Sequence, residues 1–484
     1  MKEKIIAIDQ GTSSTRAVLY DAKGRLLDAA QEEFQQFFPQ EGWVEHNPEL
    51  IWESVLSTLT TLTKKNNLTS SDIASIGITN QRETTIVWNR KTGEPISNAI
   101  VWQDRRTAEF CNSLSGEEKL VQKKTGLTLD PYFSATKLHW LLNNIEGAKE
   151  LAINGDLLFG TVDTYLIWKL TEGRSFKTDV TNASRTMLFN TKEQEWDEDL
   201  LNLFQVPKKM LPEVCDNVHN FGFTSILGGE ITIGGVAGDQ QAALIGQCCF
   251  DPGEVKSTYG TGCFMIVNTG EHILTSENKL LSTIGYRING ETTYALEGSI
   301  FVAGSAVQWL RDGLNLFKDS SEIESLAKDA STDSNVLVVP ALTGLGAPYW
   351  DAEARGAIFG LTRDTNIADI TKATLESIIF LSRDLLEAMK KDNANFNSLM
   401  VDGGMVVNNW FCQQLSNILE VQVLRPKIIE TTSLGAGYLA GLHAGVFENI
   451  DSLKTFKQID ETFNPLKESN RYKEWKGAVE KVLT

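Results

Sequence analysis

A glycine turn rich in hydroxyl side chains lies near the start of the chain, within IAIDQGTSSTRAVLYD at residues 6–21. Its glycine, Gly11, would let backbone N–H groups approach an anion, and the hydroxyls that follow would add side-chain donors. Arg16 adds positive charge, and Asp9 could hold a water molecule of a bound Mg²⁺. These residue types suit phosphate, although the turn has neither a GxxxxGK[ST] loop nor a GxGxxG fingerprint. Taken alone, the pattern fits an ordinary polar hairpin turn equally well.

Three further residues could handle the hydroxyl groups of a substrate. Asp239 follows an apolar strand expected over residues 231–236 and opens a helix, where it could accept a proton from an alcohol or simply cap the helix. Arg82 and Glu83 follow a strand expected over residues 73–78. A polyol hydroxyl both donates and accepts hydrogen bonds, so a guanidinium beside a carboxylate suits it. The alternative for this pair is a surface ion pair at the end of a strand.

A second turn of the same kind opens the later half of the chain. Strand residues 255–259 run into Gly260-Thr261-Gly262, and residues 263–267 lead away from it. Because both halves begin with strand, glycine turn and strand, the sequence predicts the duplication of one α/β unit. We expect an N-terminal domain at 1–248 and a C-terminal domain at 249–484, packed closely around a cleft because no low-complexity linker separates them.

Other segments have the patterns of the elements that must position these turns. A helix should begin at Asn47-Pro48 and run to about Lys65, because it has an N-cap, a proline at the first position and an apolar stripe. Asp104 is expected to cap a helix that carries Arg105 and Arg106. Further helices are expected at 137–151, 161–171 and 407–419 and in a charged, solvated tail at 466–482, and further strands at 25–30, 84–88, 336–340 and 399–401.

Composition narrows the class of protein. The 484 residues are 42% hydrophobic and 22% charged, as in ordinary soluble proteins, and are enough for two domains. A net charge of −18 argues against binding to nucleic acid or to anionic membranes. Six cysteines without a CxxC pair, no signal-peptide pattern and no apolar run long enough to span a bilayer predict a cytoplasmic protein with reduced thiols.

Eight stretches, in order, resemble motifs of the glycerol kinases in the FGGY carbohydrate kinase family. They are IAIDQGTSSTRAVLYD, TNQRETTIVW, VWQDRR, AGDQQAALIGQ, TYGTGCFMIVNTG, VAGSAVQWLRD, GLGAPYWDAEARGAIFGLT and VDGGMVVNNWFCQQLSNIL. The resemblance extends from about residue 4 to residue 445. It implies an α/β fold of two duplicated ribonuclease H-like domains, of the actin, hexokinase and Hsp70 ATPase type, around a deep cleft.

The resemblance also implies an activity and a role for each matching residue. The activity is ATP-dependent phosphorylation of glycerol to sn-glycerol 3-phosphate by in-line transfer, with Asp239 as general base and with Mg²⁺ held through water by Asp9 and Asp239. The residues implied to contact glycerol are Arg82, Glu83, Trp102, Tyr132, Asp239, Gln240 and Phe264. Those implied to contact the nucleotide are Thr12, Ser13, Ser14, Arg16, Thr261, Gly262, Gly304, Gln308, Gly404 and Asn408.

Two other functions remain open on these motifs. An FGGY kinase for another small polyol or ketose would share the nucleotide site and Asp239, but should lack the Arg82-Glu83 pair walled by Trp102 and Phe264. A non-enzymatic ATP-dependent switch would lack a base beside such a pair. We expect a homodimer or homotetramer. We expect neither control by a sugar bisphosphate nor by histidine phosphorylation, because FTSILGGEITIGG has no Lys or Arg and His219 does not match the family's histidine motif.

Overall fold

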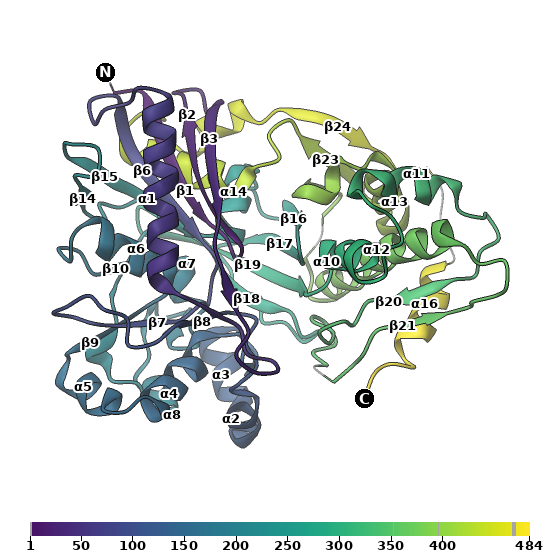
Figure 1. Cartoon of the computed structure of the whole chain (residues 1–484), viewed down its shortest axis with the longest axis horizontal. Coiled ribbons are helices and arrows are strands. Elements are labelled where there is room, and N and C mark those ends of the chain that lie inside the picture. Colours follow the sequence, from purple (N-terminus) through teal and green to yellow (C-terminus); the bar gives the residue numbers. More distant parts are fainter. Residues whose placement is uncertain (1, 352, 395, 467–470) are drawn as a thin grey trace.

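The structure is a computed structural model that describes residues 2–351, 353–394, 396–466 and 471–484. Two mixed β-sheets form its centre, and helices pack on their faces (Figure 1). The first sheet has the order β14 (Phe223–Thr224), β15 (Ile231–Gly238), β6 (Ile73–Asn80), β1 (Lys4–Gln10), β2 (Ser14–Tyr20) and β3 (Leu26–Glu33). The second has the order β18 (Leu281–Ile288), β19 (Glu291–Ile300), β17 (Cys263–Gly270), β16 (Val255–Tyr259), β22 (Ser398–Asp402), β23 (Gln422–Pro426) and β24 (Ile459–Phe463).

The two sheets repeat one topology. In each, the first strand of a hairpin pairs antiparallel with the second strand and parallel with a later one: β1 with β2 and β6, and β16 with β17 and β22. A further parallel strand follows on one side, β15 or β23, and a further antiparallel strand on the other, β3 or β19. The predicted duplication of one α/β unit is therefore confirmed, and the two predicted hairpins form its first two strands in both halves.

Smaller sheets and the helices surround these two sheets. The smaller sheets contain β4 (Gln36–Phe37), β5 (Glu45–His46) and β8 (Ala99–Ile100); β7 (Ile86–Asn89) and β9 (Leu157–Gly160); β10 (Lys177–Asp179) and β13 (Glu213–Cys215); β11 (Phe189–Asn190) and β12 (Glu195–Trp196); and β20 (Leu337–Val339) and β21 (Ala357–Phe359). The helices are α1 (Pro48–Lys65), α2 (Ala108–Ser113), α3 (Glu118–Thr125), α4 (Ser134–Asn144), α5 (Ala148–Asn154), α6 (Val162–Leu170), α7 (Val180–Ala183), α8 (Glu198–Phe204), α9 (Asp239–Gly246), α10 (Gly304–Gln308), α11 (Ile323–Asp329), α12 (Ile367–Lys391), α13 (Asn409–Leu419), α14 (Thr431–His443), α15 (Ile450–Leu453) and α16 (Arg471–Val479).

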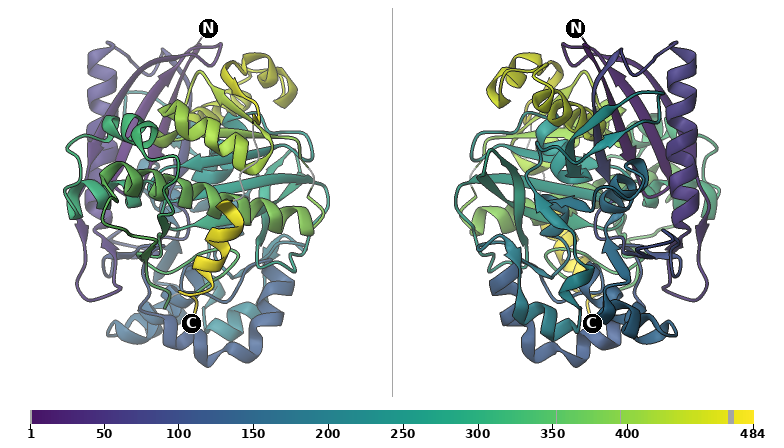
Figure 2. Two further views of the ribbon diagram at one scale, coloured as in Figure 1. Left: turned by 90° about the vertical axis from the view of Figure 1, so that its right-hand side faces the viewer. Right: turned by 90° about the vertical axis from the view of Figure 1, so that its left-hand side faces the viewer.

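Helix α1 forms as its sequence predicts. The Asn47 side chain accepts a hydrogen bond from the backbone N–H of Glu49, and Pro48 is the first helical residue. Its apolar stripe, which includes Ile51 and Val55, is buried against β2 and β3. Figure 2 shows α1 along one outer side of the molecule, with the N- and C-termini at opposite ends.

Helices α9 and α14 pack against each other between the two sheets. Glycine allows this close approach, because a Cβ atom at Gly435 would lie 1.8 Å from the Ala242 carbonyl oxygen and one at Gly246 would lie 2.0 Å from that of Thr431. Although α14 comes from the later half of the chain, it also packs against β15, β6 and β1. The domain boundary at residue 248 stays a prediction.

Three expectations for the helices were wrong. Asp104 does not cap a helix: its carboxylate accepts hydrogen bonds from the Val44 N–H and from Arg106, and α2 begins only at residue 108. The helix expected at 137–151 is two helices, because the chain leaves helical geometry at Ile145 and turns through a left-handed glycine at 147. The tail helix α16 is not fully solvated, since Trp475 is completely buried and its indole N–H donates to the Val338 carbonyl at 2.8 Å. Residues 467–470 of that expected helix lie outside the described residues.

Within the described ranges, none of the helices has both the length and the apolar character needed to cross a bilayer. All six cysteines are buried, and none forms a disulfide.

Candidate active site

A cavity of about 180 Å³ lies between the turns of the two hairpins. This is smaller than the roughly 300–1,000 Å³ typical of pockets for drug-sized ligands, so it suits a small molecule. It collects residues from the β1–β2 turn, from the chain after β6, from the start of α9 and from the β16–β17 hairpin. Its lining residues are Thr12, Ser13, Arg82, Glu83, Trp102, Tyr132, Asp239, Gln240, Thr258, Gly260, Thr261, Gly262 and Phe264.

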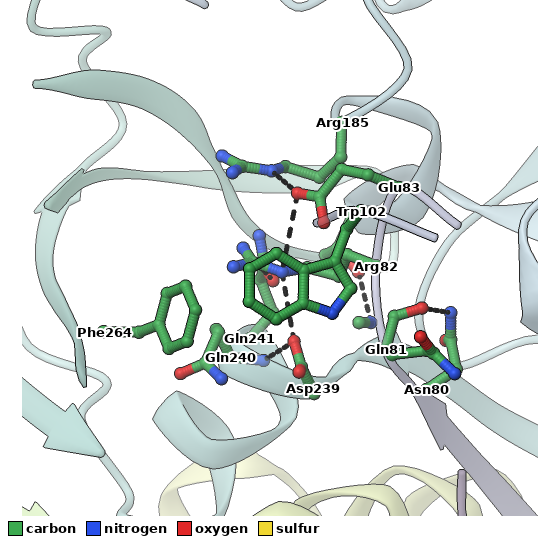
Figure 3. A network of polar contacts seen from close by, with 12 residues as sticks. Asn80, Gln81, Arg82, Glu83, Trp102, Arg185, Asp239, Gln240, Gln241 and Phe264 are labelled. Carbon is green, nitrogen blue, oxygen red and sulfur yellow. Dashed lines mark hydrogen bonds and ion pairs between the residues drawn. The ribbon is translucent and has the colours of Figure 1, made fainter. Parts of the chain in front are cut away.

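Arg82 and Glu83 are not a surface ion pair. Both side chains are only 2% exposed, and the Arg82 Nε lies 3.9 Å from the nearer Glu83 oxygen. The short contact of Glu83 is instead to Arg185, whose Nε donates to Oε1 at 2.6 Å (Figure 3). The backbone of Glu83 has a φ of +60°, a left-handed conformation that costs about 1–3 kcal/mol for such a residue. Surrounding hydrogen bonds hold this turn, including one from the Ser134 hydroxyl to the Glu83 carbonyl at 3.0 Å.

Glu297 and Arg185 complete a buried network around Arg82 that was not predicted. The Arg82 guanidinium donates to both Glu297 oxygens, at 2.5 and 3.0 Å, and Arg185 donates to Glu297 at 3.0 Å. Burial alone would raise the pKa of Glu297, but the two arginines lower it to about 2. Glu83 differs, because burial outweighs its arginine neighbours and raises its pKa. The network thus keeps the Arg82 guanidinium charged and holds it at the edge of the cavity.

Asp239 is the first residue of α9, and the N-cap position belongs to Gly238. Its carboxylate accepts a hydrogen bond from the Gln240 N–H at 2.7 Å and lies 3.0 Å from the Arg82 Nε. The side chain is 30% exposed, in contrast to the enclosed Glu83 and Glu297. Asp239 therefore presents a carboxylate to the cavity, beside a guanidinium, as a proton acceptor for an alcohol would.

Aromatic rings form the apolar wall of the cavity. The Trp102 ring meets the Tyr132 ring edge to face at 5.7 Å and the Phe264 ring at 6.0 Å. The Trp102 indole N–H donates to the Thr12 hydroxyl at 3.0 Å, which ties this wall to the first glycine turn. Figure 3 shows Trp102 and Phe264 beside one another, near the Arg82 and Asp239 side chains. The predicted polyol-contacting residues thus lie together, and their roles stay predictions.

Asp9 provides the donor chemistry that a hard divalent cation needs. Burial, and then the neighbouring carboxylates of Glu430 and Asp239, raise the pKa of Asp9 to about 7 against the opposing charge of Arg16. Carboxylates gathered around a buried aspartate in this way favour a bound cation. Asp9 and Asp239 therefore fit the predicted water-mediated Mg²⁺ site.

The residues predicted to bind nucleotide are spread more widely. Thr12, Ser13, Thr261 and Gly262 line the cavity, whereas Arg16 forms an ion pair with Glu430 and Ser14 accepts a hydrogen bond from Gln31 at 3.1 Å.

The remaining predicted nucleotide residues flank the second hairpin without lining the cavity. Gly304 contacts its turn, since the Gly304 N–H donates to the Gly260 carbonyl at 2.9 Å. Gln308 and Gly404 are exposed to solvent, as a ligand site at the surface requires. Asn408 is buried at the start of α13, and its side-chain Nδ2 has no hydrogen-bond partner among the described residues. A buried donor without an acceptor is costly, so the Asn408 Nδ2 fits a ligand that accepts a hydrogen bond from it.

A second buried network of polar side chains contacts the two chain segments that lead into Arg82 and Asp239. The Asp179 carboxylate accepts hydrogen bonds from Asn182 at 2.7 Å and Asn217 at 2.8 Å and from the Thr181 hydroxyl, which in turn accepts from the N–H of Gly238 at 2.9 Å. Asn182 also exchanges two hydrogen bonds of 3.0 Å with Asn80, close to Arg82. The network therefore fixes the residues just before Arg82 and Asp239.

Comparison with known proteins agrees with the resemblance of the motifs. Profiles of the N-terminal and C-terminal domains of the FGGY family of carbohydrate kinases match residues 4–246 and 255–444. The chain is 56% identical over 492 residues to a glycerol kinase of Marinomonas sp. (strain MWYL1), with all of both chains covered.

Solved structures give the same result. The fold is similar to that of Plasmodium falciparum glycerol kinase with ADP, with a TM-score of 0.90 and 37% identity over 99% of this chain and 98% of that one. It is also similar to ligand-bound xylulose kinase from Lactobacillus acidophilus, with a TM-score of 0.85 and 25% identity over 98% of this chain and 96% of that one. The predicted family and fold class are therefore confirmed.

Proposed function

Because this chain belongs to the FGGY family of carbohydrate kinases, we propose that it transfers the γ-phosphoryl group of ATP to glycerol and forms sn-glycerol 3-phosphate. One observation carries the choice of acceptor. The cavity is small, has an aromatic wall, and brings a fixed guanidinium and two carboxylates together between two glycine turns. High identity to glycerol kinases over the full length supports the same acceptor.

Arg82 and Glu83 orient the acceptor. A hydroxyl oxygen of glycerol accepts a hydrogen bond from the Arg82 guanidinium and donates its own proton to a carboxylate oxygen of Glu83. Trp102, Tyr132 and Phe264 pack against the carbon atoms and limit the length of the substrate. Buried polar groups that a wrong substrate leaves unpaired reject it by about 10⁴-fold or more.

Asp239 acts as the general base of the transfer. As the terminal hydroxyl oxygen of glycerol forms its bond to the γ-phosphorus, the bond from that phosphorus to the β–γ bridging oxygen breaks and ADP leaves. The hydroxyl proton passes to the Asp239 carboxylate, which faces the cavity. Positioning of the in-line groups supplies most of the acceleration in such reactions.

The two glycine turns and the α10–α13 region hold the nucleotide. Thr12 and Ser13 donate to phosphate oxygens from the first half, and Thr261 and Gly262 from the second. The Asn408 Nδ2, which has no hydrogen-bond partner among the described residues, and the exposed Gln308 and Gly404 frame the nucleoside. Mg²⁺, when bound through water to Asp9 and Asp239, neutralises phosphate charge. Cytoplasmic location and assembly as a homodimer or homotetramer remain expectations from the sequence.

A coupled assay of ADP release tests the proposed function. Purified protein with Mg²⁺ and ATP is offered glycerol, dihydroxyacetone, erythritol, xylulose or gluconate in parallel. We expect glycerol to give the highest kcat/KM by a wide margin and ATP hydrolysis without acceptor to be slow, because closure of the halves excludes water. A higher kcat/KM for xylulose, gluconate or erythritol would assign another FGGY acceptor. Hydrolysis that no acceptor stimulates would instead indicate an ATP-dependent switch.

A further inference from the structure

A row of three residues crosses the second sheet on the face that meets the first half of the chain. Lys256 on β16 pairs with Ile266 on β17, and Ile266 pairs with Glu297 on β19. Residues directly opposite each other in antiparallel strands place their side chains on the same face of the sheet. The ammonium group and the carboxylate therefore flank one apolar residue on this face, and both are completely buried.

Glu297 reaches across the boundary between the halves to the substrate arginine. It accepts hydrogen bonds from two different guanidinium nitrogens of Arg82, which fixes the plane of that group as a bidentate pair. The Gln241 side chain accepts a third hydrogen bond from Arg82, at 3.2 Å. These bonds use three of the five guanidinium N–H donors, and the Arg82 Nε lies beside Asp239 at the cavity.

Lys256 also reaches across the boundary between the halves, to Gln240, which is predicted to contact the acceptor. Its ammonium donates to the side-chain oxygen of Gln240 on α9 and to the hydroxyl of Thr258 at 2.9 Å. Gln240 and Thr258 both line the cavity, one from each half of the molecule. Burial lowers the pKa of Lys256, while Asp402 and Asp239 favour its charged form. The lysine thus joins the helix that carries Asp239 to the second glycine hairpin.

Both contacts depend on the two halves lying together. If the sheets separated, Glu297 would leave two buried arginines without their shared carboxylate, and Lys256 would lose Gln240. Removing one partner from a buried ion pair is strongly destabilising, because the other charge stays uncompensated. The orientation of Arg82 and Gln240 is therefore set by the second sheet and not only by the turns that carry them.

We propose that Glu297 and Lys256 are positioning residues for the acceptor: they hold Arg82 and Gln240 in their binding geometry only when the second sheet is in contact with the first half. This rests on the proposed function, since it assigns how that glycerol site is assembled. Acceptor binding then depends on two residues, Glu297 and Lys256, that do not themselves line the cavity.

The test compares Glu297→Gln and Lys256→Met with a matched control, Glu376→Gln. Glu376 is also a buried glutamate paired with an arginine, at 3.0 Å from Arg471, but this pair joins α12 to α16 and includes none of the residues that line the cavity. KM for glycerol, KM for ATP, kcat and thermal unfolding are measured for each. We expect KM for glycerol to rise at least about tenfold in both test variants while KM for ATP changes less than about threefold. The control should change neither KM.

Equal changes in KM for glycerol and KM for ATP would overturn the proposal. An unchanged KM for glycerol in a folded Glu297→Gln protein would also overturn it. If Glu297→Gln does not fold, Glu297→Asp and Arg82→Lys are combined in a double-mutant cycle. A coupling in glycerol KM of at least about tenfold supports the proposal, and additive effects contradict it. Wild-type protein that does not phosphorylate glycerol would remove the proposed function instead, which is a separate outcome.

Discussion

The two glycine hairpins occupy equivalent places in the two sheets but carry different chemistry. In the first, Asp9 pairs across the hairpin with Arg16, immediately before Gln10 and the turn at Gly11. In the second, the corresponding cross-strand pair is Thr258 with Phe264, before Tyr259 and the turn at Gly260. A charged pair in one half thus stands where a hydroxyl and an aromatic ring stand in the other.

This difference shows how one repeated unit serves two purposes. In the proposed function the charged pair serves the cation and the phosphate oxygens, and neither of its residues is among those that line the cavity. Phe264 instead faces Trp102 across the cavity and closes the acceptor side. The backbone of the repeat supplies a turn in both halves, while the side chains beside the turn decide which part of the reaction each half serves.

The largest contrast is expected between Asp239, which begins α9, and Glu430, which precedes α14; these helices follow the equivalent strands β15 and β23. Asp239→Asn should lower kcat by roughly 10²–10⁴-fold, because the base that accepts the proton is lost. Glu430, just before α14, forms an ion pair with Arg16, so Glu430→Gln should lower kcat less than tenfold. Steady-state kinetics with saturating glycerol and ATP measure both. Similar losses in the two variants would refute a unique role for Asp239.

A smaller contrast is expected between the equivalent strand residues Asp9 and Thr258. Asp9→Asn should raise the free Mg²⁺ concentration for half-maximal rate by about 10–100-fold, as for other residues that hold a metal through water. Thr258→Ala should leave the Mg²⁺ requirement unchanged, since Thr258 has no carboxylate that could hold a water molecule of the metal ion. Initial rates over a Mg²⁺ titration at fixed ATP decide between them. An equal shift in both variants would mean that Asp9 does not act through the metal.

The turns themselves should tolerate a methyl group differently. A Cβ at Gly262 would lie 2.7 Å from the Ile300 carbonyl oxygen, whereas one at Gly11 would lie 3.2 Å from that of Ser14. Overpacking against backbone costs about 1–3 kcal/mol, so Gly262→Ala should lose that much unfolding free energy and Gly11→Ala less. Urea unfolding measures this, with Gly404→Ala as control because, apart from its chain neighbours, no heavy atom of the described residues would lie within 4 Å of a Cβ there. Equal stability of all three variants would contradict the expectation.

The smallest effect concerns the acid that supports Gly238 in the first half. Burial, and then the charge of Asp163, raise the pKa of Asp179 from 3.8 to about 7. The folded protein therefore holds this proton more tightly than the unfolded chain, so its contribution to stability falls as the pH rises towards and through 7. In Asp179→Asn, the decrease in unfolding free energy from pH 6 to pH 8 should be smaller by about 1 kcal/mol. Denaturant unfolding at the two pH values tests this, and an unchanged decrease would contradict it.

Elements that are determined by local interactions could be predicted from the sequence. Both hairpins follow from glycine turns between short apolar strands, and α1 follows from Asn47, Pro48 and one apolar stripe. The error at Asp104 has the same origin: capping was expected from neighbours in sequence, but the carboxylate is used by Val44, from another part of the chain.

The charged residues beneath the site could not be assigned in this way. Glu297 lies 215 positions from Arg82 and Arg185 lies 102 positions from Glu83, so only the folded topology brings them together. A signal was nevertheless present, because Glu297 and Lys256 stand within strand segments of apolar and small residues. In a sheet covered on both faces, a charge in such a segment must find a buried partner.

Helix α14 has a consequence for how the protein is made. Its residues cover the face of β1, β6 and β15, although even the last of those strands, β15, ends nearly 200 positions before α14 begins. A ribosome that synthesises the chain from its N-terminus releases the first sheet long before the segment that shields it. The apolar face of the first sheet therefore stays exposed to water until α14 has been synthesised, and exposed surface of this kind promotes aggregation. A chaperone that masks that face would therefore raise the yield of active protein, and cutting the chain between its halves would not yield two independent units.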